Sequence, residues 1–205
     1  FCLSNPKVTK HLITSIGDEC YVTLPKGQIP DTQSSKSPVP GGGHVLIIPI
    51  GHYPTMRGIP SEQMSAISKE VDQYKTALRE CYKKHGASMV TFEVGRYSGK
   101  GGHAHVQVCP IPDALASKVA TAFSEQGAQE GYDFEDEQDV LDAQDIKENY
   151  LRIEPPDGST MVHLLKPGKR FDLQWARSVV ASLLGDPDRA DWKSCARSDA
   201  EEKAE

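Results

Sequence analysis

The most regular pattern of apolar positions in the chain lies between residues 60 and 85. Apolar side chains recur there three and four residues apart, from Met64 to Cys81, as they do on one face of an amphipathic helix. Pro60 suits the first turn of such a helix, and Gly86 suits the cap that follows its C-terminal end. The pattern therefore predicts one long helix with a single apolar face.

Short apolar runs on both sides of this helix predict β-strands, because they have the length of strands and are bounded by turn residues. Residues 27–43, which are rich in Gly, Pro and Ser, predict a surface loop. Strands, a long helix and further strands favour an α+β fold, with the helix on one face of an antiparallel sheet. The predicted strands comprise residues 8–16, 20–24, 44–50, 89–94 and 103–109.

The character of the chain changes after Pro112. We place a domain boundary there, between a unit of residues 1–112 and a second, smaller α+β unit of residues 113–205. Residues 127–147 are strongly acidic, and we expect them to form a mobile segment. The other elements predicted in the second unit are helices at residues 114–126 and 173–184 and a hairpin of strands at residues 150–153 and 161–165.

The net charge limits the kinds of partner that the chain can bind. The 205 residues carry a formal net charge of −6, which argues against sequence-independent binding of nucleic acid over a broad surface. Much of this acidity lies in residues 130–148 and 199–205, so a local site for an anionic ligand is compatible with it. No apolar run approaches the roughly 20 residues that a membrane span requires. The five scattered cysteines favour a reducing compartment, and a first residue other than Met indicates a piece of a longer protein.

Polar and apolar residues alternate along residues 103–109. On a strand, this alternation places His103, His105 and Gln107 on one face and small apolar side chains on the other. Since the apolar face must pack against a core, the polar face lines a cleft or meets solvent. An imidazole in such a cleft can attack a phosphorus atom and form a covalent nucleotidyl intermediate. The alternative is a surface strand with two histidines that have no chemical role.

A glycine-rich segment with two cations leads into this strand. Backbone N–H groups in a tight glycine turn, together with basic side chains, form the kind of site that binds phosphate. Glu93, just upstream, is a candidate for orienting Arg96, with an edge-strand carboxylate as the alternative. The candidate phosphate-binding residues are Arg96, Gly99, Lys100, Gly101 and Gly102.

The alternating histidines resemble the signature of the histidine-triad superfamily of nucleotide-binding proteins. In that family the middle histidine is the nucleophile, which implies this role for His105, with His103 and Gln107 beside it as catalytic residues. The glutamine at the third position is similar to the branch that contains galactose-1-phosphate uridylyltransferase. Residues 43–52 resemble the strand that these proteins place beside the site.

A narrower resemblance, to the C-terminal region of CwfJ-type proteins, covers almost the whole chain. That family includes splicing-associated proteins, among them a factor that accompanies the intron-lariat debranching enzyme. The stretches that carry the resemblance are residues 1–6, residues 51–53, Phe92 and Glu93 with Arg96, the His-x-His-x-Gln strand, and residues 191–193.

This resemblance implies a nuclear factor, able to shuttle to the cytoplasm, that assists intron-lariat debranching or turnover and binds a nucleotide monophosphate or an RNA end at the histidine cleft. It implies as partners the lariat debranching enzyme, RNA or a nucleotide, spliceosome components, and an N-terminal metallophosphoesterase-like domain of the same protein. Two other interpretations stay open: an active nucleotidyl hydrolase or transferase that uses His105, and a catalytically silent scaffold that docks a protein. Because Gln107 cannot titrate and offers no general acid, we expect slow nucleotidyl transfer or, as the favoured outcome, binding without turnover.

Two departures from the histidine-triad pattern concern ligands. Many relatives carry an aspartate that contacts the ribose where this chain has Pro25 and Lys26, so Lys26 is a candidate phosphate contact, with a solvated loop lysine as the alternative. Transferase-branch relatives hold a structural zinc ion with a Cys-x-x-Cys pair and two histidines. The zinc ligands that this implies are Cys2, His52 and His103, with the second cysteine expected before Phe1.

Three large side chains stand out in the second unit. Trp175 and Trp192 are interpreted as anchors of its core. Arg177, on the same predicted helix as Trp175, is either a solvated residue of a helix face or a contact to an RNA phosphate.

Overall fold

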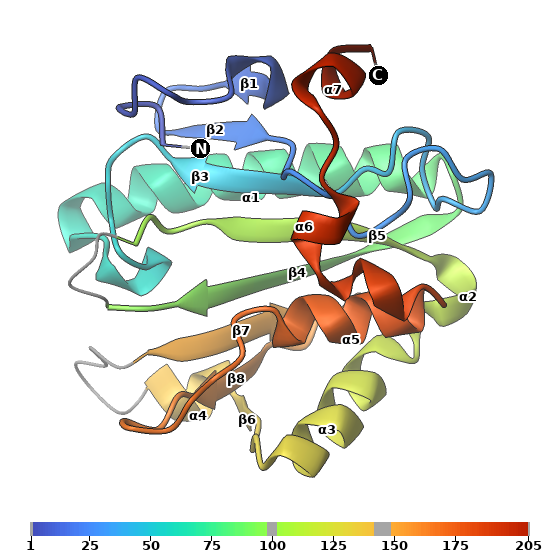
Figure 1. Cartoon of the computed structure of the whole chain (residues 1–205). Helices are drawn as coiled ribbons and strands as arrows, with labels where there is room; N and C mark the ends of the chain where they lie inside the picture. The colour runs from blue at the N-terminus through green and yellow to red at the C-terminus, as the bar shows by residue number, and fades with distance from the viewer. Residues whose placement is uncertain (1, 98–101, 142–148, 205) are drawn as a thin grey trace.

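The computed structural model describes residues 2–97, 102–141 and 149–204. Within these ranges, eight strands form one antiparallel sheet in the order β1-β2-β3-β5-β4-β7-β8-β6 (Figure 1). The strands are β1 (Ile13–Ile16), β2 (Cys20–Thr23), β3 (Val45–Pro49), β4 (Ala87–Gly95), β5 (Val106–Pro112), β6 (Glu135–Asp136), β7 (Tyr150–Glu154) and β8 (Met161–Leu164).

Helices cover both faces of this sheet (Figure 1). The long helix α1 (Ser61–Lys83) lies on one face, and α3 (Val119–Glu130) and α5 (Trp175–Leu183) lie on the other. None of the helices in the described ranges is long and apolar enough to cross a membrane. The short helices are η1 (Lys10–Leu12), η2 (Met56–Gly58), α2 (Asp113–Ala116), α4 (Glu137–Leu141), η3 (Pro187–Ala190), α6 (Trp192–Cys195) and α7 (Asp199–Ala204).

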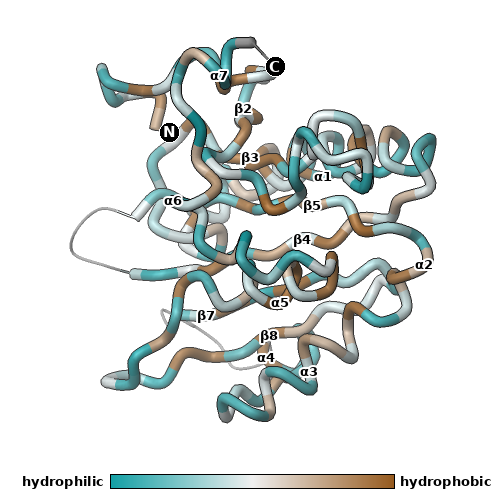
Figure 2. Tube along the Cα trace, turned by 45° about the vertical axis from the view of Figure 1, so that its right-hand side comes forward, coloured by the Kyte–Doolittle hydropathy of each residue, from teal (hydrophilic) through white to brown (hydrophobic). Residues whose placement is uncertain are grey.

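Alternation along β5 divides its side chains between two cores. Val106 and Val108 belong to a cluster with Ile67 of α1, whereas Cys109 belongs to a cluster with Val180 of α5. Figure 2 shows that apolar residues are concentrated in the strands, between these two helical layers. The side chains of a strand point alternately to its two faces. Gln107, two residues before Cys109, therefore lies on the same face as Cys109, which is the α5 side of the sheet.

The pairing of β4 with β7 joins the two predicted units. Five residue pairs, from Thr91 opposite Glu154 to Gly95 opposite Tyr150, make β7 a direct neighbour of β4. Strands from both sides of Pro112 therefore belong to one sheet. The domain boundary near Pro112 stays a prediction.

An ion network also fastens α1 to β7. Lys75 Nζ lies 2.7 Å from Glu154 Oε2, and Arg152 contacts Glu154 and binds Glu137 of α4 at 2.7 Å. Burial alone would raise the pKa of Glu154, but the charges of Lys75 and Arg152 outweigh burial and hold this pKa at about 2. The carboxylate therefore stays ionised at neutral pH and links the helix to the second unit.

The fold-class prediction is confirmed, since the structure is α+β and the long predicted helix lies as α1 on one face of an antiparallel sheet. The strand expected from His103 begins at Val106, because Ala104 N–H donates to the loop carbonyl of Tyr53 and not to a neighbouring strand. The helix expected at residues 114–126 is interrupted between α2 and α3. The acidic segment expected to be mobile contains β6 and α4 in its described part.

Candidate functional site

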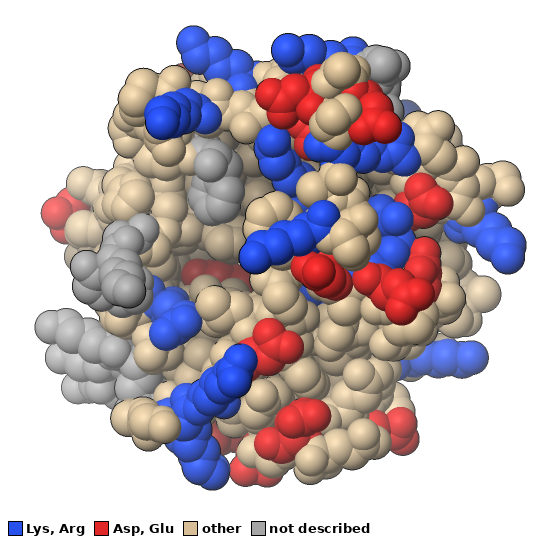
Figure 3. Space-filling view, in the orientation of Figure 1, with Lys and Arg blue, Asp and Glu red and all other residues tan. Residues whose placement is uncertain are grey.

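A pocket of about 390 Å³ opens on the α5 face of the sheet, at the end where β5 begins. Its floor comes from three neighbouring strands, because Thr23 of β2 lies opposite Leu46 of β3, which lies opposite Gln107 of β5. Figure 3 shows this face hollowed near its middle. The apolar side chains around the pocket include Val8, Leu12, Leu24, Leu46 and Trp192.

The second unit completes this pocket. Gln174 and Arg177 approach it from the start of α5. Trp192 of α6, a residue that is 37% exposed, adds an indole. Trp192 is thus not a core anchor, and the interpretation of this residue from the sequence was wrong. Trp175, by contrast, is buried in the core between the sheet and α3.

His105 lines the pocket with a defined tautomer. Its Nδ1–H donates to the backbone carbonyl of His103 at 2.9 Å, and because a carbonyl can only accept, the lone pair of the ring lies on Nε2. Burial lowers the pKa of His105 below its usual value, so the ring is neutral at pH 7. A neutral imidazole with its lone pair on Nε2 is the form that can act as a nucleophile.

Gln107 lies beside a second buried histidine, His44. Burial, followed by the charge of Arg177, lowers the pKa of His44 to about 3, and an interaction with Gln107 partly offsets this shift. His44 Nδ1 accepts from the backbone N–H of Ile29 at 3.2 Å, so its proton resides on Nε2. Gln107 also lines the pocket, to which it brings a side-chain amide.

Arg177 brings a buried positive charge to the pocket. The residue is 3% exposed, and its Nε–H donates to the carbonyl oxygens of Arg189 and Ala190 at 2.9 Å. Its buried Nη2 has no hydrogen-bond acceptor among the described residues. A buried guanidinium with an unused donor is costly unless an anion or another acceptor meets it.

Not all of the predicted phosphate-binding residues come together. Lys26 lines the pocket, but it forms an ion pair with Asp199 of α7 at 3.2 Å. Arg96 is exposed and lines a different cavity, and Gly102 packs near the Arg96 backbone. Gly99, Lys100 and Gly101 lie outside the described residues.

Glu93 does not belong to this pocket. Phe92 lies opposite Gln107, so Glu93, the next residue, points to the α1 face of the sheet. Its Oε1 accepts from Met56 N–H at 2.8 Å, and the residue is 4% exposed. Burial raises the pKa of this carboxyl to about 7, and the hydrogen bond from Met56 opposes the shift. Glu93 therefore binds the backbone at Met56 on the α1 face of the sheet. The expectation that it orients Arg96 was wrong.

Glu93→Gln should stabilise the protein increasingly as the pH rises. A carboxyl whose pKa is about 7 when folded and about 4.3 when unfolded disfavours folding across that interval, and the full effect is reached above pH 7. The difference in unfolding free energy between the variant and the unmodified chain should therefore be larger at pH 8 than at pH 4, in favour of the variant, by on the order of 3 kcal/mol. Urea unfolding of both proteins at several pH values measures the difference, and parallel pH profiles would contradict it.

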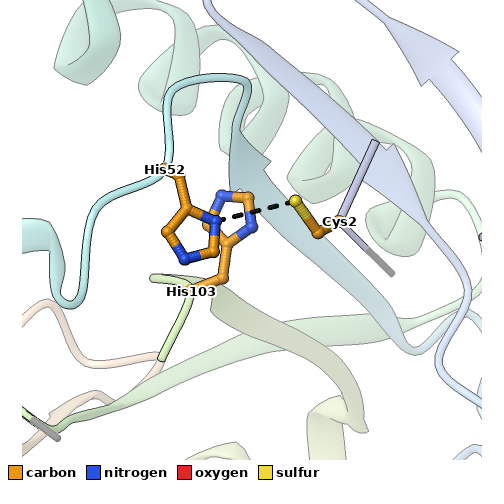
Figure 4. A group of neighbouring side chains, drawn as sticks. All are labelled: Cys2, His52 and His103. Carbon is orange, nitrogen blue, oxygen red and sulfur yellow. Dashed lines mark hydrogen bonds between the residues drawn. The ribbon is translucent and has the colours of Figure 1, made fainter. Parts of the chain in front are cut away.

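The predicted zinc ligands do come together. Cys2 Sγ lies 3.6 Å from His52 Nδ1, and the rings of His52 and His103 are 4.4 Å apart between centroids (Figure 4). Ligand atoms of all three side chains lie within 4.8 Å of one another. A sulfur and a nitrogen that bind one tetrahedral zinc ion at ~2.3 and ~2.0 Å are roughly 3.5 Å apart, so the spacing fits.

The protonation of these groups fits a cation as well. His103 Nε2–H donates to the carbonyl of Pro49 at 2.9 Å, which puts the ring lone pair on Nδ1, and a backbone carbonyl is a common outer partner of a zinc-bound histidine. A hydrogen bond with Ser4 and the proximity of His52 lower the pKa of the Cys2 thiol to about 7 against the effect of burial. The three side chains would hold zinc as a structural clamp between the N-terminus and the loop after β3, with one position left for a further ligand.

Cobalt(II), a spectroscopic substitute for zinc, should therefore bind and give the absorption of a thiolate–metal bond. Cys2→Ser should abolish this band, because it removes the only sulfur ligand of the three. Cys81→Ser, at an exposed position of α1, is the matched control and should leave the band unchanged. A spectrum without a thiolate band, or one that Cys2→Ser leaves intact, would show that the cluster does not hold the metal.

Two sequence families match the chain and together cover nearly all of it. The family described as "Protein similar to CwfJ C-terminal" matches residues 1–124, and "Protein similar to CwfJ C-terminus 2" matches residues 126–205. Among solved structures, a hypothetical histidine triad nucleotide-binding protein from Sulfolobus tokodaii is 12% identical, with a TM-score of 0.35 over 88% of this chain and 83% of that chain.

Full-length relatives extend well beyond this chain. CWF19-like protein mug161 of Schizosaccharomyces pombe is 37% identical over 100% of this chain and 36% of its own length. CWF19-like protein 1 of Xenopus laevis is 37% identical over 99% of this chain and 35% of its own length. Zinc finger CCCH domain-containing protein 64 of Arabidopsis thaliana is 35% identical over 98% of this chain and 33% of its own length. The chain thus spans about a third of the length of these relatives, and it belongs to the family of proteins similar to the CwfJ C-terminal region.

Proposed function

We propose that this chain is an RNA-processing module of a nuclear protein that binds a nucleotide, or the terminal nucleotide of an RNA, in the pocket of His105 and Gln107. Membership of the CwfJ-type family supports a role in splicing, and more specifically in intron-lariat debranching or turnover. In that role its partners are the lariat debranching enzyme, spliceosome components and a metallophosphoesterase-like domain of the full-length protein, with shuttling between nucleus and cytoplasm.

The convergence of three polar groups in one apolar pocket carries this proposal. His105 offers a neutral nitrogen, Gln107 an amide, and Arg177 a buried cation with an unused donor. Apolar side chains such as Leu46 and Trp192 line the rest of the pocket, where they suit the faces of a nucleobase. A volume of about 390 Å³ lies within the range of roughly 300–1,000 Å³ that is typical of small-molecule sites.

The same geometry supports nucleotidyl transfer as a second candidate function. The Nε2 lone pair of His105 would attack phosphorus, form a P–N bond and displace the leaving oxygen with its electron pair, after which water would hydrolyse the adduct. Arg177 and the Gln107 amide would stabilise the charge that develops on the non-bridging oxygens. Gln107 cannot supply a proton to the leaving group, so turnover is expected to be slow.

Titration with AMP and GMP by calorimetry tests the binding proposal. Arg177→Gln should weaken binding roughly 10- to 100-fold, because hydrogen bonds to charged groups contribute about 1.5–3 kcal/mol. Arg79→Gln, at an exposed position of α1, removes the same charge and should leave the affinity unchanged. Gln107→Leu, with a milder effect on folding, provides a second test. The proposal is wrong if neither nucleotide binds at millimolar concentration or if the control loses as much affinity as Arg177→Gln.

His105→Ala separates chemistry from binding. A labelled dinucleotide, with trapping under acid-free conditions, detects a phosphohistidine adduct. The variant should not form this adduct, because the adduct forms on the ring of His105. Its affinity for AMP should stay within about tenfold, or 1.4 kcal/mol, of the unmodified chain. His85→Ala, at an exposed position just after α1, is the control. Unchanged cleavage of a dinucleotide by His105→Ala would refute the assignment of the nucleophile.

A further inference from the structure

A second cavity, of about 630 Å³, adjoins the nucleotide pocket. The two share Gln174, which lines both. We call this second cavity the basic groove, because four cations line it: Arg96, Lys166, Lys169 and Arg170. Asp172 is the one carboxylate among the described residues that line it. The groove is therefore strongly positive in a chain whose net charge is −6.

The ends of three neighbouring strands position the groove. β4 ends at Gly95 opposite Tyr150, where β7 begins, and Tyr150 lies opposite Leu164, where β8 ends. Asn149 ties these ends together, since its carbonyl accepts from Leu165 N–H at 2.8 Å and its Oδ1 accepts from Tyr97 N–H at 2.7 Å. Arg96 and the loop between β8 and α5 consequently flank the same cavity, at the end of the sheet where His105 lies.

The cations of the groove are available to a ligand. All four are exposed, and within the described ranges none forms a salt bridge. Asp172 is partly engaged, because its Oδ1 accepts from Gln174 N–H at 2.9 Å. In Figure 3, basic side chains gather at the lower left of the face, where the loop between β8 and α5 lies in Figure 1.

Apolar surface accompanies these charges. Leu173 is 42% exposed, and Phe171 is half-buried against Tyr132, with 5.2 Å between ring centroids. Both residues line the groove. Proteins that bind single-stranded nucleic acid combine a row of cations along the phosphate backbone with side chains on which bases can stack.

We propose that the basic groove binds the phosphodiester backbone of a single-stranded RNA whose terminal nucleotide occupies the His105 pocket. This inference rests on the proposed function and narrows its substrate class from nucleotides to oligonucleotides. The shared residue Gln174 marks the point at which the RNA strand would pass from the pocket into the groove. An acidic peptide would use the charges of the groove but would have no use for the pocket.

Binding of AMP and of a 5′-phosphorylated oligoadenylate octamer, measured over a range of salt concentrations, tests the inference. We expect the octamer to bind at least about tenfold more tightly than AMP at low salt, because further phosphates then contact the groove. The variant Lys166→Ala/Lys169→Ala/Arg170→Ala should abolish this gain, reduce the slope of log affinity against log salt by about 2, and leave AMP binding unchanged. Arg79→Ala/Lys83→Ala/Lys84→Ala removes equal charge at exposed positions on α1 and after it, and should keep the gain.

The outcomes separate this inference from the proposed function. Equal affinities for AMP and the octamer, or a gain that survives in the groove variant, would overturn the groove and leave the nucleotide pocket standing. A groove-dependent octamer complex without measurable AMP binding would support the groove and overturn the pocket. Binding of neither ligand overturns both. A hexaglutamate peptide that competes with the octamer as well as unlabelled octamer does would overturn the assignment to RNA.

Discussion

The antiparallel pairing of β4 with β7 is the contact on which the architecture of the candidate site depends. It attaches the C-terminal strands to the N-terminal ones in a single sheet, and it pairs an edge of β4 that would otherwise be exposed. Because α5 packs on this sheet, the same pairing sets α5 over the face that carries Gln107. Neither half of the chain contains the pocket alone, since β5 and the residue before it supply Gln107 and His105, while the later segment supplies Arg177 and Trp192.

Backbone carbonyls orient the histidines of the site in succession. The carbonyl of Pro49, at the end of β3, accepts from the ring of His103, and the carbonyl of His103 accepts from the ring of His105. Each bond fixes a tautomer, so the lone pair of His103 lies on Nδ1 and that of His105 on Nε2. The cluster of Cys2, His52 and His103 and the pocket thereby share one segment of chain, and a metal ion bound to His103 would also restrict the position of His105.

Local alternation correctly predicted that His105 and Gln107 share one face, but it also predicted His103 there. The strand begins only at Val106, and His103 lies with Cys2 and His52 and does not line the pocket. The contributions of Lys26, Glu93 and Arg177 could not be obtained in this way. The burial of Arg177 depends on the carbonyls of a later turn, and the partner of Lys26 lies in α7. The sequence predicts which residues of β4 share a face with Glu93. Whether that face is also the face of Gln107 depends on the register of β4 with β5. Long-range contacts, and not propensities, decide these positions.

The order in which the strands emerge during synthesis follows from the same topology. β4 and β5 are successive strands and can pair as soon as both have left the ribosome, whereas β7 is made only after α3 and β6. In the interval, one side of β4 carries N–H and C=O groups that have no strand beside them, and such an edge can pair with an extended segment of another chain. The later half of the chain therefore first protects the sheet: once β7 has paired with β4, this edge can no longer pair with another chain, and only then can the wall of the His105 pocket form.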